Sequence, residues 1–377
     1  AYLSLVTVGG DFLGFQWDNL LLECDLLALF LVPLGISVPR GARVPGLAAF
    51  ACRWLLFRLM LGSGLVKLES GDPAWRHLTA LFYHYQTQPL PTPLAWWMAQ
   101  LPGAFQRASC FFVLAVELGA PLLLIGPRRF RAYAFPPLAL LQVLIALTGN
   151  YCFFNLLALG LCFFALEDAA WPARARAWFA PRAGRGVFPP VWARALLLAP
   201  LLLISAAQFA GLLGLRWPGR VLAPLEEAAA PFRSVNPYGL FAVMTTRRFE
   251  ITVEGSDDGA HWKAYGFQDK PGDLSRAPRW VAPLQPRLDW QMWFAALGPA
   301  EESPWLKAFL TRLLQGSPQV TALLGDDPFP DAPPRSIRAE IAEYRFTDAA
   351  ERARTGDWWE RGEPQLYVPA FSLAGVK

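Results

Sequence analysis

Residues 132–167 read AYAFPPLALLQVLIALTGNYCFFNLLALGLCFFALE, and this stretch contains a single charged side chain, at its very end. A segment of about 20 predominantly apolar residues is long enough to cross the hydrocarbon core of a bilayer as a helix. The stretch holds two such segments, 132–148 and 150–167, which are separated only at Gly149 and Asn150. We therefore expect two membrane helices that are joined as a tight hairpin.

Similar apolar segments recur through the first 215 residues of the chain. The composition agrees, because 54% of the 377 residues are hydrophobic and 17% are charged, whereas soluble domains average about 25% charged residues. The net charge of +4 is too small to indicate nucleic-acid binding. We predict a multi-pass α-helical membrane domain over residues 1–215. Its spans are expected near 20–37, 46–66, 104–126, 132–148, 150–167 and 191–213.

The placement of arginine predicts the orientation of this domain, because cytoplasmic loops carry an excess of Lys and Arg. The loops after the first, third and fifth predicted spans share one side of the membrane, and they hold Arg40, Arg43, Arg128, Arg129, Arg131, Arg174, Arg176, Arg182 and Arg185. On the other side, the loop after the second span holds a single arginine, Arg76. Residues 67–103 and everything after Leu213 are therefore expected to face outwards, into a bacterial periplasm or the lumen of the endoplasmic reticulum. Because the chain begins with Ala1, we also expect that an earlier segment precedes it.

The pattern changes after the last predicted span. Residues 216–235 have the composition of an amphipathic, proline-broken connector. Beyond it, Phe249, Ile251 and Val253 alternate with polar residues, which is the period of a β-strand. Further expected elements are a hairpin turn at 255–259, strands at 262–267 and 335–346, and helices at 290–297 and 304–315. We predict that residues 236–377 form an extracytoplasmic, β-sandwich-like α+β domain.

Several signatures of catalysis and cofactor binding are absent from the sequence. All five cysteines lie in apolar runs, and they are Cys24, Cys52, Cys110, Cys152 and Cys162. No CxxC pair is present, so neither a zinc site nor a thiol-redox motif is expected. Gly62-Ser63-Gly64 lacks the spacing of a nucleophile elbow, and no glycine-rich phosphate loop occurs. We expect no metal and no cofactor, and we do not expect the protein to be a lipase itself.

Long and unusual sequence words run through both halves of the chain. In the second half they are Tyr238-Gly239-Leu240-Phe241, Lys270-Pro271-Gly272-Asp273 and the run VAPLQPRLDWQMWF at 281–294. In the membrane half they are Leu56-Phe57-Arg58-Leu59-Met60, Gly71-Asp72-Pro73 and the run YHYQTQPLP at 83–91. Over essentially its whole length the chain closely resembles the lipase maturation factor family. The resemblance implies a membrane protein with a lumenal C-terminal domain that secreted lipases need in order to fold and assemble.

The function implied by this resemblance is that of a membrane-anchored, chaperone-like maturation factor. Its expected partners are a secreted lipase or another exported client protein, together with membrane lipids. Candidate residues for client binding, or for the motifs themselves, are Tyr83, His84, Tyr85, Gln86, Trp290, Trp293, Trp358 and Trp359. Trp358 and Trp359 lie near a polar C-terminus and are favoured as an exposed patch or a membrane-facing anchor. Trp290 and Trp293 share one helical stretch, which is more typical of a core.

A shorter resemblance suggests an alternative. The run Gly64-Leu65-Val66-Lys67-Leu68, followed by Asp72, is similar to a segment of the vitamin K-dependent γ-carboxylases and their bacterial membrane relatives. In that family the segment carries the lysine that acts as a base. The resemblance implies a membrane enzyme in which Lys67 is the base, assisted by Asp72 or His84. A lysine at the end of a span also commonly extends to the membrane surface, or pairs with a nearby carboxylate such as Glu69 or Asp72.

Three acidic residues, Glu23, Asp25 and Glu117, fall inside or near apolar spans. A carboxylate at membrane depth costs about 2.5–3.5 kcal/mol unless it is paired. Arg53 and Arg58 are the expected partners, and the alternative is that the carboxylates line a substrate cavity.

The run 83–88 contains His84 between two tyrosines, with two glutamines following. This run either lines a polar pocket at the membrane surface or forms a hydrogen-bonded structure packed under the C-terminal domain.

Overall fold

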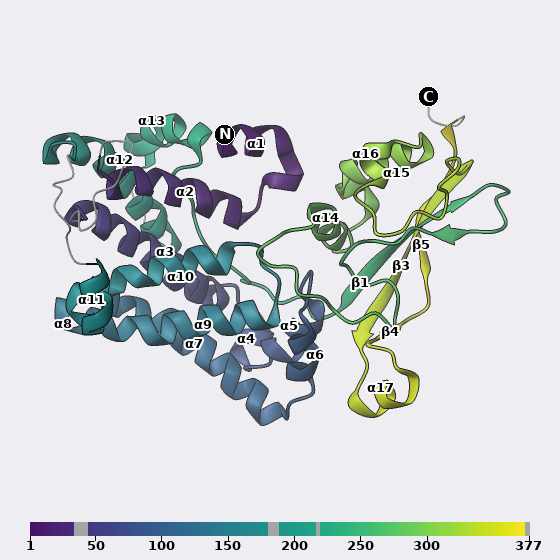
Figure 1. Ribbon diagram of the computed structural model, residues 1–377, viewed down its shortest axis with the longest axis horizontal. Helices are drawn as coiled ribbons and strands as arrows, with labels where there is room; N and C mark the ends of the chain where they lie inside the picture. The colour runs from purple at the N-terminus through teal and green to yellow at the C-terminus, as the bar shows by residue number, and fades with distance from the viewer. Residues whose placement is uncertain (34–43, 180–187, 216–218, 374–377) are drawn as a thin grey trace. The chain divides into compact units, whose positions relative to one another are not determined.

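The computed structural model describes residues 1–33, 44–179, 188–215 and 219–373 of the chain. Their contacts group them into two compact units, whose helices and strands are labelled in Figure 1. The helical unit comprises Ala1–Thr79, Arg107–Ile145 and Phe153–Met244, and the sheet unit comprises Ala80–Gln106, Ala146–Cys152 and Thr245–Lys377. Residues 34–37 of the first predicted span, and Arg40, Arg43, Arg182 and Arg185 of the predicted cytoplasmic loops, lie outside the described residues.

Four helices within the described ranges are long and apolar enough to cross a membrane. They are α3 (Gly46–Glu69), α7 (Gly103–Ile125), the run Arg128–Thr148, which includes α9 (Phe135–Thr148), and α12 (Val191–Leu212). They correspond to the predicted spans at 46–66, 104–126, 132–148 and 191–213. These helices identify the chain as an integral membrane protein.

The other two predicted spans fall on shorter helices. The predicted span 20–37 overlaps α2 (Gln16–Leu31), and the predicted span 150–167 overlaps α10 (Phe154–Cys162). The expected tight hairpin also differs in the structure, because α9 ends at Thr148 and five residues separate it from α10. One of these five is Asn150, whose side chain forms hydrogen bonds with distant parts of the chain.

Helix α3 is the central element of the helical unit. Of its most apolar stretch, 67% is buried, against 22–39% for the other three long helices. It packs against α2, α10 and α12. The unit also contains the shorter helices α1 (Tyr2–Gly9), α4 (Pro73–Arg76), α8 (Arg128–Arg131), α11 (Ala173–Phe179) and α13 (Gly219–Ala229). Polar side chains on α3 are therefore the ones that protein, rather than lipid, surrounds.

The sheet unit is built on an antiparallel sheet (Figure 1). Its strands are β1 (Arg248–Ser256), β2 (Lys263–Ala264), β3 (Ser336–Phe346), β4 (Trp359–Arg361) and β5 (Gln365–Phe371). The order is β2-β1-β3-β4, and β5 also pairs with β3. Ile251 lies opposite Ile341 and Val253 opposite Ala339, so these apolar side chains share one face. The predicted α+β character of the C-terminal region is confirmed.

Helices, rather than a second sheet, pack against these strands. Among the described residues all the strands belong to one sheet, while α14 (Arg287–Ala295) contacts β1 and α15 (Pro304–Leu314) contacts β3. Leucine and phenylalanine side chains recur along α15 at the spacing of one helical face, and they are buried. The short helices α16 (Pro318–Thr321) and α17 (Ala349–Thr355) complete this region.

Two helices from the membrane half of the chain also belong to the sheet unit. They are α5 (Ala80–Thr87) and α6 (Pro93–Ala99), which follow α3 and α4 in the sequence. Helix α5 contacts β3. Conversely, residues 236–244 group with the helical unit. Each unit is therefore assembled from both halves of the sequence.

Candidate functional site

An irregular segment of backbone, residues 236–241, lies along α3 in the helical unit. It is neither helix nor strand, and Arg58, Ser63 and Lys67 bind it. The Arg58 guanidinium donates to the carbonyl oxygen of Asn236 at 3.0 Å, and the Lys67 ammonium donates to that of Leu240 at 3.0 Å. Irregular backbone beside a membrane span needs such partners inside the protein, because lipid offers none. The polar side chains of α3 supply them.

Two glycines allow this segment to approach α3 closely. A Cβ atom at Gly62 would lie 2.7 Å from the carbonyl oxygen of Tyr238, closer than real Cβ contacts. A Cβ atom at Gly239 would lie 2.9 Å from the side chain of Val66. The sequence words around residues 62 and 239 thus meet in space, although they are 177 positions apart in the chain.

Lys67 forms a buried ion pair with Glu117 of α7. Its Nζ atom lies 2.8 Å from Oε2 of Glu117, and it also donates to the carbonyl oxygen of Ser63 at 3.1 Å. With Leu240, these contacts occupy all three donors of the ammonium. Neither Glu69 nor Asp72, the carboxylates expected from the sequence, is the ion-pair partner. Asp72 instead caps α4, where it accepts from the backbone of Ala74 at 2.8 Å.

A second buried ion pair joins Arg58 to Glu23 of α2. The same carboxylate accepts a hydrogen bond of 2.7 Å from the hydroxyl of Tyr238. The prediction that an arginine pairs with an intramembrane carboxylate is confirmed for Arg58 and Glu23. It is wrong for Glu117, whose partner is Lys67, and Asp25 is exposed on α2.

Arg58 also lines a cavity of about 290 Å³. The polar part of its lining consists of side chains such as Gln16, Arg58, Gln208 and Asn236. The apolar part includes Phe209. As far as described residues line it, the cavity contains no histidine, cysteine or carboxylate. It can hold a small molecule or water.

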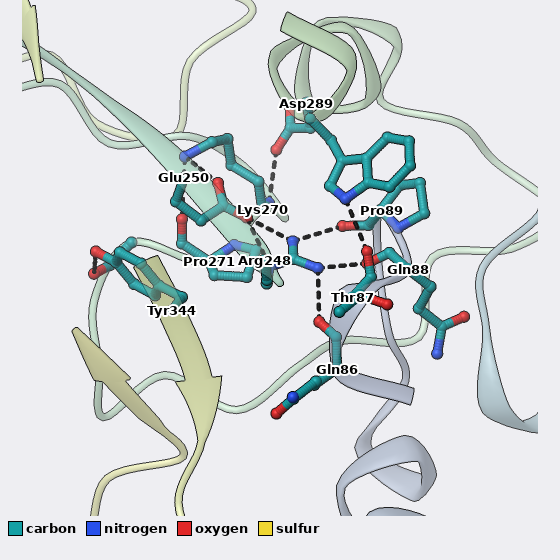
Figure 2. A network of polar contacts seen from close by, with 12 residues as sticks. Gln86, Thr87, Gln88, Pro89, Arg248, Glu250, Lys270, Pro271, Asp289 and Tyr344 are labelled. Carbon is teal, nitrogen blue, oxygen red and sulfur yellow. Dashed lines mark hydrogen bonds and ion pairs between the residues drawn. The ribbon is translucent and has the colours of Figure 1, made fainter. Parts of the chain in front are cut away.

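The sheet unit contains a second buried polar network, which Figure 2 shows. Arg248 on β1 donates to the carbonyl oxygens of Gln86 at 3.0 Å and Pro89 at 2.8 Å, and also to that of Gln88. Glu250 lies between two cations, because it pairs with Arg248 and, at 2.9 Å, with Lys270. Burial lowers the pKa of Arg248, and the charge of Glu250 opposes that shift. The guanidinium stays charged and fixes the backbone that follows α5.

The run 83–89 is therefore a hydrogen-bonded packing element. Its backbone accepts further bonds, including one of 2.8 Å from the indole of Trp293 to the carbonyl oxygen of Thr87. The amide oxygen of Gln86 accepts from the backbone of Phe346 at 3.1 Å. Of the two arrangements that the sequence left open for this run, the structure shows the one packed under the C-terminal strands.

Comparison with known proteins places this architecture in a family. The family model for the lipase maturation factor transmembrane domain matches residues 1–173, and the model for the lipase maturation factor C-terminal domain matches residues 234–369.

The chain belongs to the lipase maturation factor family. It is 36% identical to lipase maturation factor 2 of Gallus gallus, over 99% of this chain and 67% of that protein. It is also 36% identical to lipase maturation factor 2 of Homo sapiens, over 99% and 68%, and 33% identical to lipase maturation factor 1 of Mus musculus, over 100% and 69%. No solved structure matches the chain.

In this member of the lipase maturation factor family, the residues of the predicted catalytic alternative fall into different units. Lys67 and Asp72 belong to the helical unit, whereas His84 belongs to the sheet unit. The His84 ring stacks against Tyr151 with 6.4 Å between the ring centroids. Within the described part of the chain, no group of three or more His, Cys, Asp or Glu side chains is placed to hold a metal ion.

The tryptophan candidates differ in exposure. Trp290 and Trp359 are buried, and Trp293 and Trp358 are partly buried. The prediction that Trp358 and Trp359 both form an exposed patch is wrong for Trp359, because Trp359 begins β4 and its side chain is buried in the sheet unit, whereas Trp358 precedes the strand. Trp359 packs against Phe346, with ring centroids 4.4 Å apart.

Of the other candidates, Tyr85 is buried, and Tyr83, His84 and Gln86 are partly exposed.

Sequence reasoning missed the role of Asn150. Its side-chain oxygen accepts from the backbone of Val281 at 2.7 Å, and its nitrogen donates to the carbonyl oxygens of Arg279 at 2.8 Å and Leu90 at 3.1 Å. The available signal was an asparagine within an otherwise apolar run. Such a residue needs hydrogen-bond partners, which indicates an organising role rather than a simple turn.

Proposed function

We propose that this protein is a membrane-anchored maturation factor that assists the folding or assembly of exported lipases or other secreted enzymes. The observation that carries the proposal is the match to relatives named lipase maturation factors over 99–100% of the chain. The sheet unit is proposed to face outwards and to bind the client, in a bacterial periplasm or in the lumen of the endoplasmic reticulum. The arginine-rich loops around Arg128 and Arg174 support that orientation.

The proposed mode of action is binding, with no bond made or broken. A folding enzyme exposes apolar surface, and a partner that covers it prevents misassembly until folding or dimerisation buries it. This mechanism requires a fixed apolar surface on the maturation factor. It does not require a catalytic residue.

A surface of this kind lies at the end of α14. Phe294 is exposed in the last turn of the helix and Leu297 is exposed just beyond it. The hydroxyl of Tyr367 on β5 holds this part of the chain, because it donates to the carbonyl oxygens of Ala295 at 2.7 Å and Gly298 at 2.9 Å. We call Phe294 and Leu297 the α14 surface and propose it as the client-binding region. The ring of Trp293 packs edge-on against that of Phe294, with 5.0 Å between the ring centroids.

The environment of Lys67 supports a non-catalytic role. A base must have a free lone pair, but the three donors of this lysine point to one carboxylate and two carbonyl oxygens. Its contacts are those of an ammonium that stabilises a buried arrangement. We therefore propose that Lys67 joins α3, α7 and the segment 236–241.

The proposal is tested by capturing a client on the full-length protein during export. A photo-crosslinking amino acid at Leu297 should form a covalent product with a newly exported lipase, detected with an antibody to that lipase. The same group at Trp178 on α11, an exposed residue in a predicted cytoplasmic loop, serves as the control. Capture at Leu297 that disappears once the lipase is native supports the proposal. Absence of the lipase product at Leu297, or equal capture at both positions, contradicts it.

A further inference from the structure

One loop of the sheet unit is fixed directly to the end of a membrane-spanning segment. Asn150 lies two residues after Thr148, the last residue of α9. Its side chain bonds the backbone of Arg279, Val281 and, at 2.9 Å, Ala282. The thiol of the neighbouring Cys152 also donates to the carbonyl oxygen of Pro283 at 3.4 Å. Residues 279–283 are therefore tied at several points to the chain that leaves α9.

The end of α9 is itself well defined. The hydroxyl of Thr92 donates to the carbonyl oxygen of Leu147 at 2.7 Å, and the side-chain amide of Gln88 donates to that of Thr148 at 2.8 Å. The last carbonyl groups of a helix need such partners, because no further turn of the helix is present to bond them. The helix ends there, within two residues of the Asn150 side chain.

The fixed loop presents apolar side chains outwards. Trp280 is 52% exposed and Leu284 is 74% exposed, and the five residues 280–284, WVAPL, contain no charged side chain. Arg279 precedes them and pairs with Asp269 at 3.3 Å. Contiguous exposed apolar side chains mark sites of protein or membrane interaction, and this bonded loop holds a tryptophan and a leucine away from the protein.

The position of the loop identifies that surface. A spanning helix leaves the hydrocarbon core where it ends, and tryptophan is enriched at that level of the bilayer. A second exposed tryptophan, Trp97 on α6, lies five residues after Thr92, which caps the same end of α9. Two exposed tryptophans attached to one span end form the pattern of an interfacial belt.

We propose that residues 280–284 insert into the boundary between headgroups and acyl chains of the leaflet in which α9 ends. The partner is the lipid surface itself. Asn150 sets the depth of the loop, because it joins the loop to the helix end. This inference is independent of the client: it concerns how the sheet unit is held against the membrane, not what it binds.

The test uses the full-length protein in liposomes of phosphatidylcholine and phosphatidylglycerol, without any client. A nitroxide spin label is placed at Leu284→Cys, with labelling of the unsubstituted chain as background. Leu366→Cys on β5, whose native side chain is 61% exposed, is the matched control. Two collision rates of the spin label are compared. One is with oxygen, which is more soluble in lipid than in water, and the other is with a water-soluble nickel chelate.

At Leu284 the oxygen collision rate should exceed the nickel rate several-fold, and at Leu366 the order should be reversed. A label at Leu284 that behaves like the one at Leu366 would overturn the proposal, because it would place the loop in water. A label reached by neither reagent would also overturn it, because it would place the loop against protein, such as a second copy of the chain.

Two further variants separate insertion from folding. Trp280→Cys, labelled in the same way, should give the same lipid signature as Leu284→Cys. Asn150→Ala in the Leu284→Cys background should increase the mobility of the label and reduce the oxygen preference. If Asn150→Ala does not fold, Trp280→Cys still decides the question, because that substitution leaves the bonds between Asn150 and the loop in place.

Discussion

Lys67 of α3 and Glu117 of α7 form a buried ion pair, with Nζ 2.8 Å from Oε2. Because the carbonyl oxygen of Leu240 also accepts from Lys67, this lysine joins two membrane helices and a distant segment of chain. Breaking a buried pair by removing one partner costs about 3–5 kcal/mol, since the other charge stays buried. The pair is therefore expected to stabilise the fold rather than to perform chemistry.

Substituting Lys67→Met should lower the free energy of unfolding by about 3–5 kcal/mol. The measurement is denaturant unfolding of the full-length protein in a single detergent. The double variant Lys67→Met with Glu117→Leu should recover most of the loss, because no buried charge is left unpaired. A Lys67→Met variant that unfolds like the parent, yet no longer matures lipases, would instead indicate a catalytic lysine.

Gly62→Ala should destabilise the helical unit, because the new methyl group would meet the carbonyl oxygen of Tyr238 at 2.7 Å. Displacing that backbone would also disturb the hydrogen bond between Arg58 and Asn236. Gly119→Ala on α7 is the matched control, since a Cβ atom there has nothing within 4 Å among the described atoms. Thermal unfolding in detergent should show a lower Tm for Gly62→Ala alone. Equal Tm values for the two variants would mean that the segment does not pack against α3 in this way.

Arg248→Lys should loosen the backbone after α5, although it keeps the positive charge. Lysine lacks the planar fork that reaches several carbonyl oxygens at once. Hydrogen bonds from charged groups contribute about 1.5–3 kcal/mol each, so the loss should be at least about 2 kcal/mol. Hydrogen exchange at the amides of Gln86, Thr87 and Gln88 should accelerate. The matched control is Arg247→Lys, because Arg247 is next in the sequence but exposed. This variant should change the free energy of unfolding by less than about 0.5 kcal/mol. If exchange at the same three amides also accelerated in Arg247→Lys, Arg248 would have no specific role.

The sequence predicted the regular elements well where periodicity was strong. The four long helices, β1, β3, α14 and α15 all lie close to their expected positions, because their apolar spacing is determined by local sequence. The pairing of Lys67 with Glu117 was not accessible in this way. The two residues are 50 positions apart, and nothing in a single sequence indicates which buried charges meet.

Errors in the candidate site have similar physical causes. Trp358 and Trp359 were treated as equivalent, but Trp359 begins β4 and packs against Phe346, whereas Trp358 precedes the strand and is only partly buried. Asn150 was treated as a turn residue because its partners, Arg279 to Ala282, lie 129 to 132 positions away. The predicted span 150–167 contains the shorter helix α10, because apolar composition alone does not show where a helix starts.

The exposed pair of Asp258 and His261 should make the β1–β2 hairpin sensitive to pH. Nδ1 of His261 lies 2.6 Å from Oδ2 of Asp258. The hydrogen bond and charge of Asp258 raise the pKa of His261, and the same contact holds the pKa of Asp258 well below its usual range. The contribution of protonated His261 to the stability of the hairpin is complete below the unfolded pKa of His261, about 6.5, and is lost as pH rises through its folded pKa. The contribution of ionised Asp258 to the stability of the hairpin is complete above the unfolded pKa of Asp258, about 3.9, and is lost as pH falls through its folded pKa.

The hairpin should therefore be most ordered at mildly acidic pH. Nuclear magnetic resonance of ¹³C-labelled histidine gives the titration of His261 directly. The substitution Asp258→Asn should lower the pKa of His261 towards about 6.5. An unchanged titration in this variant would show that the pair does not form in solution.

The central claim is that this protein raises the activity of exported lipases by binding them. The most direct measurement is the activity per mass of secreted lipase from cells with and without the protein, together with the intact mass of that lipase. We predict that specific activity falls several-fold without the protein, while the mass of the lipase stays the same. Unchanged specific activity would contradict a role in lipase maturation. A change in the mass of the lipase would contradict the binding mechanism and indicate that the protein modifies its client.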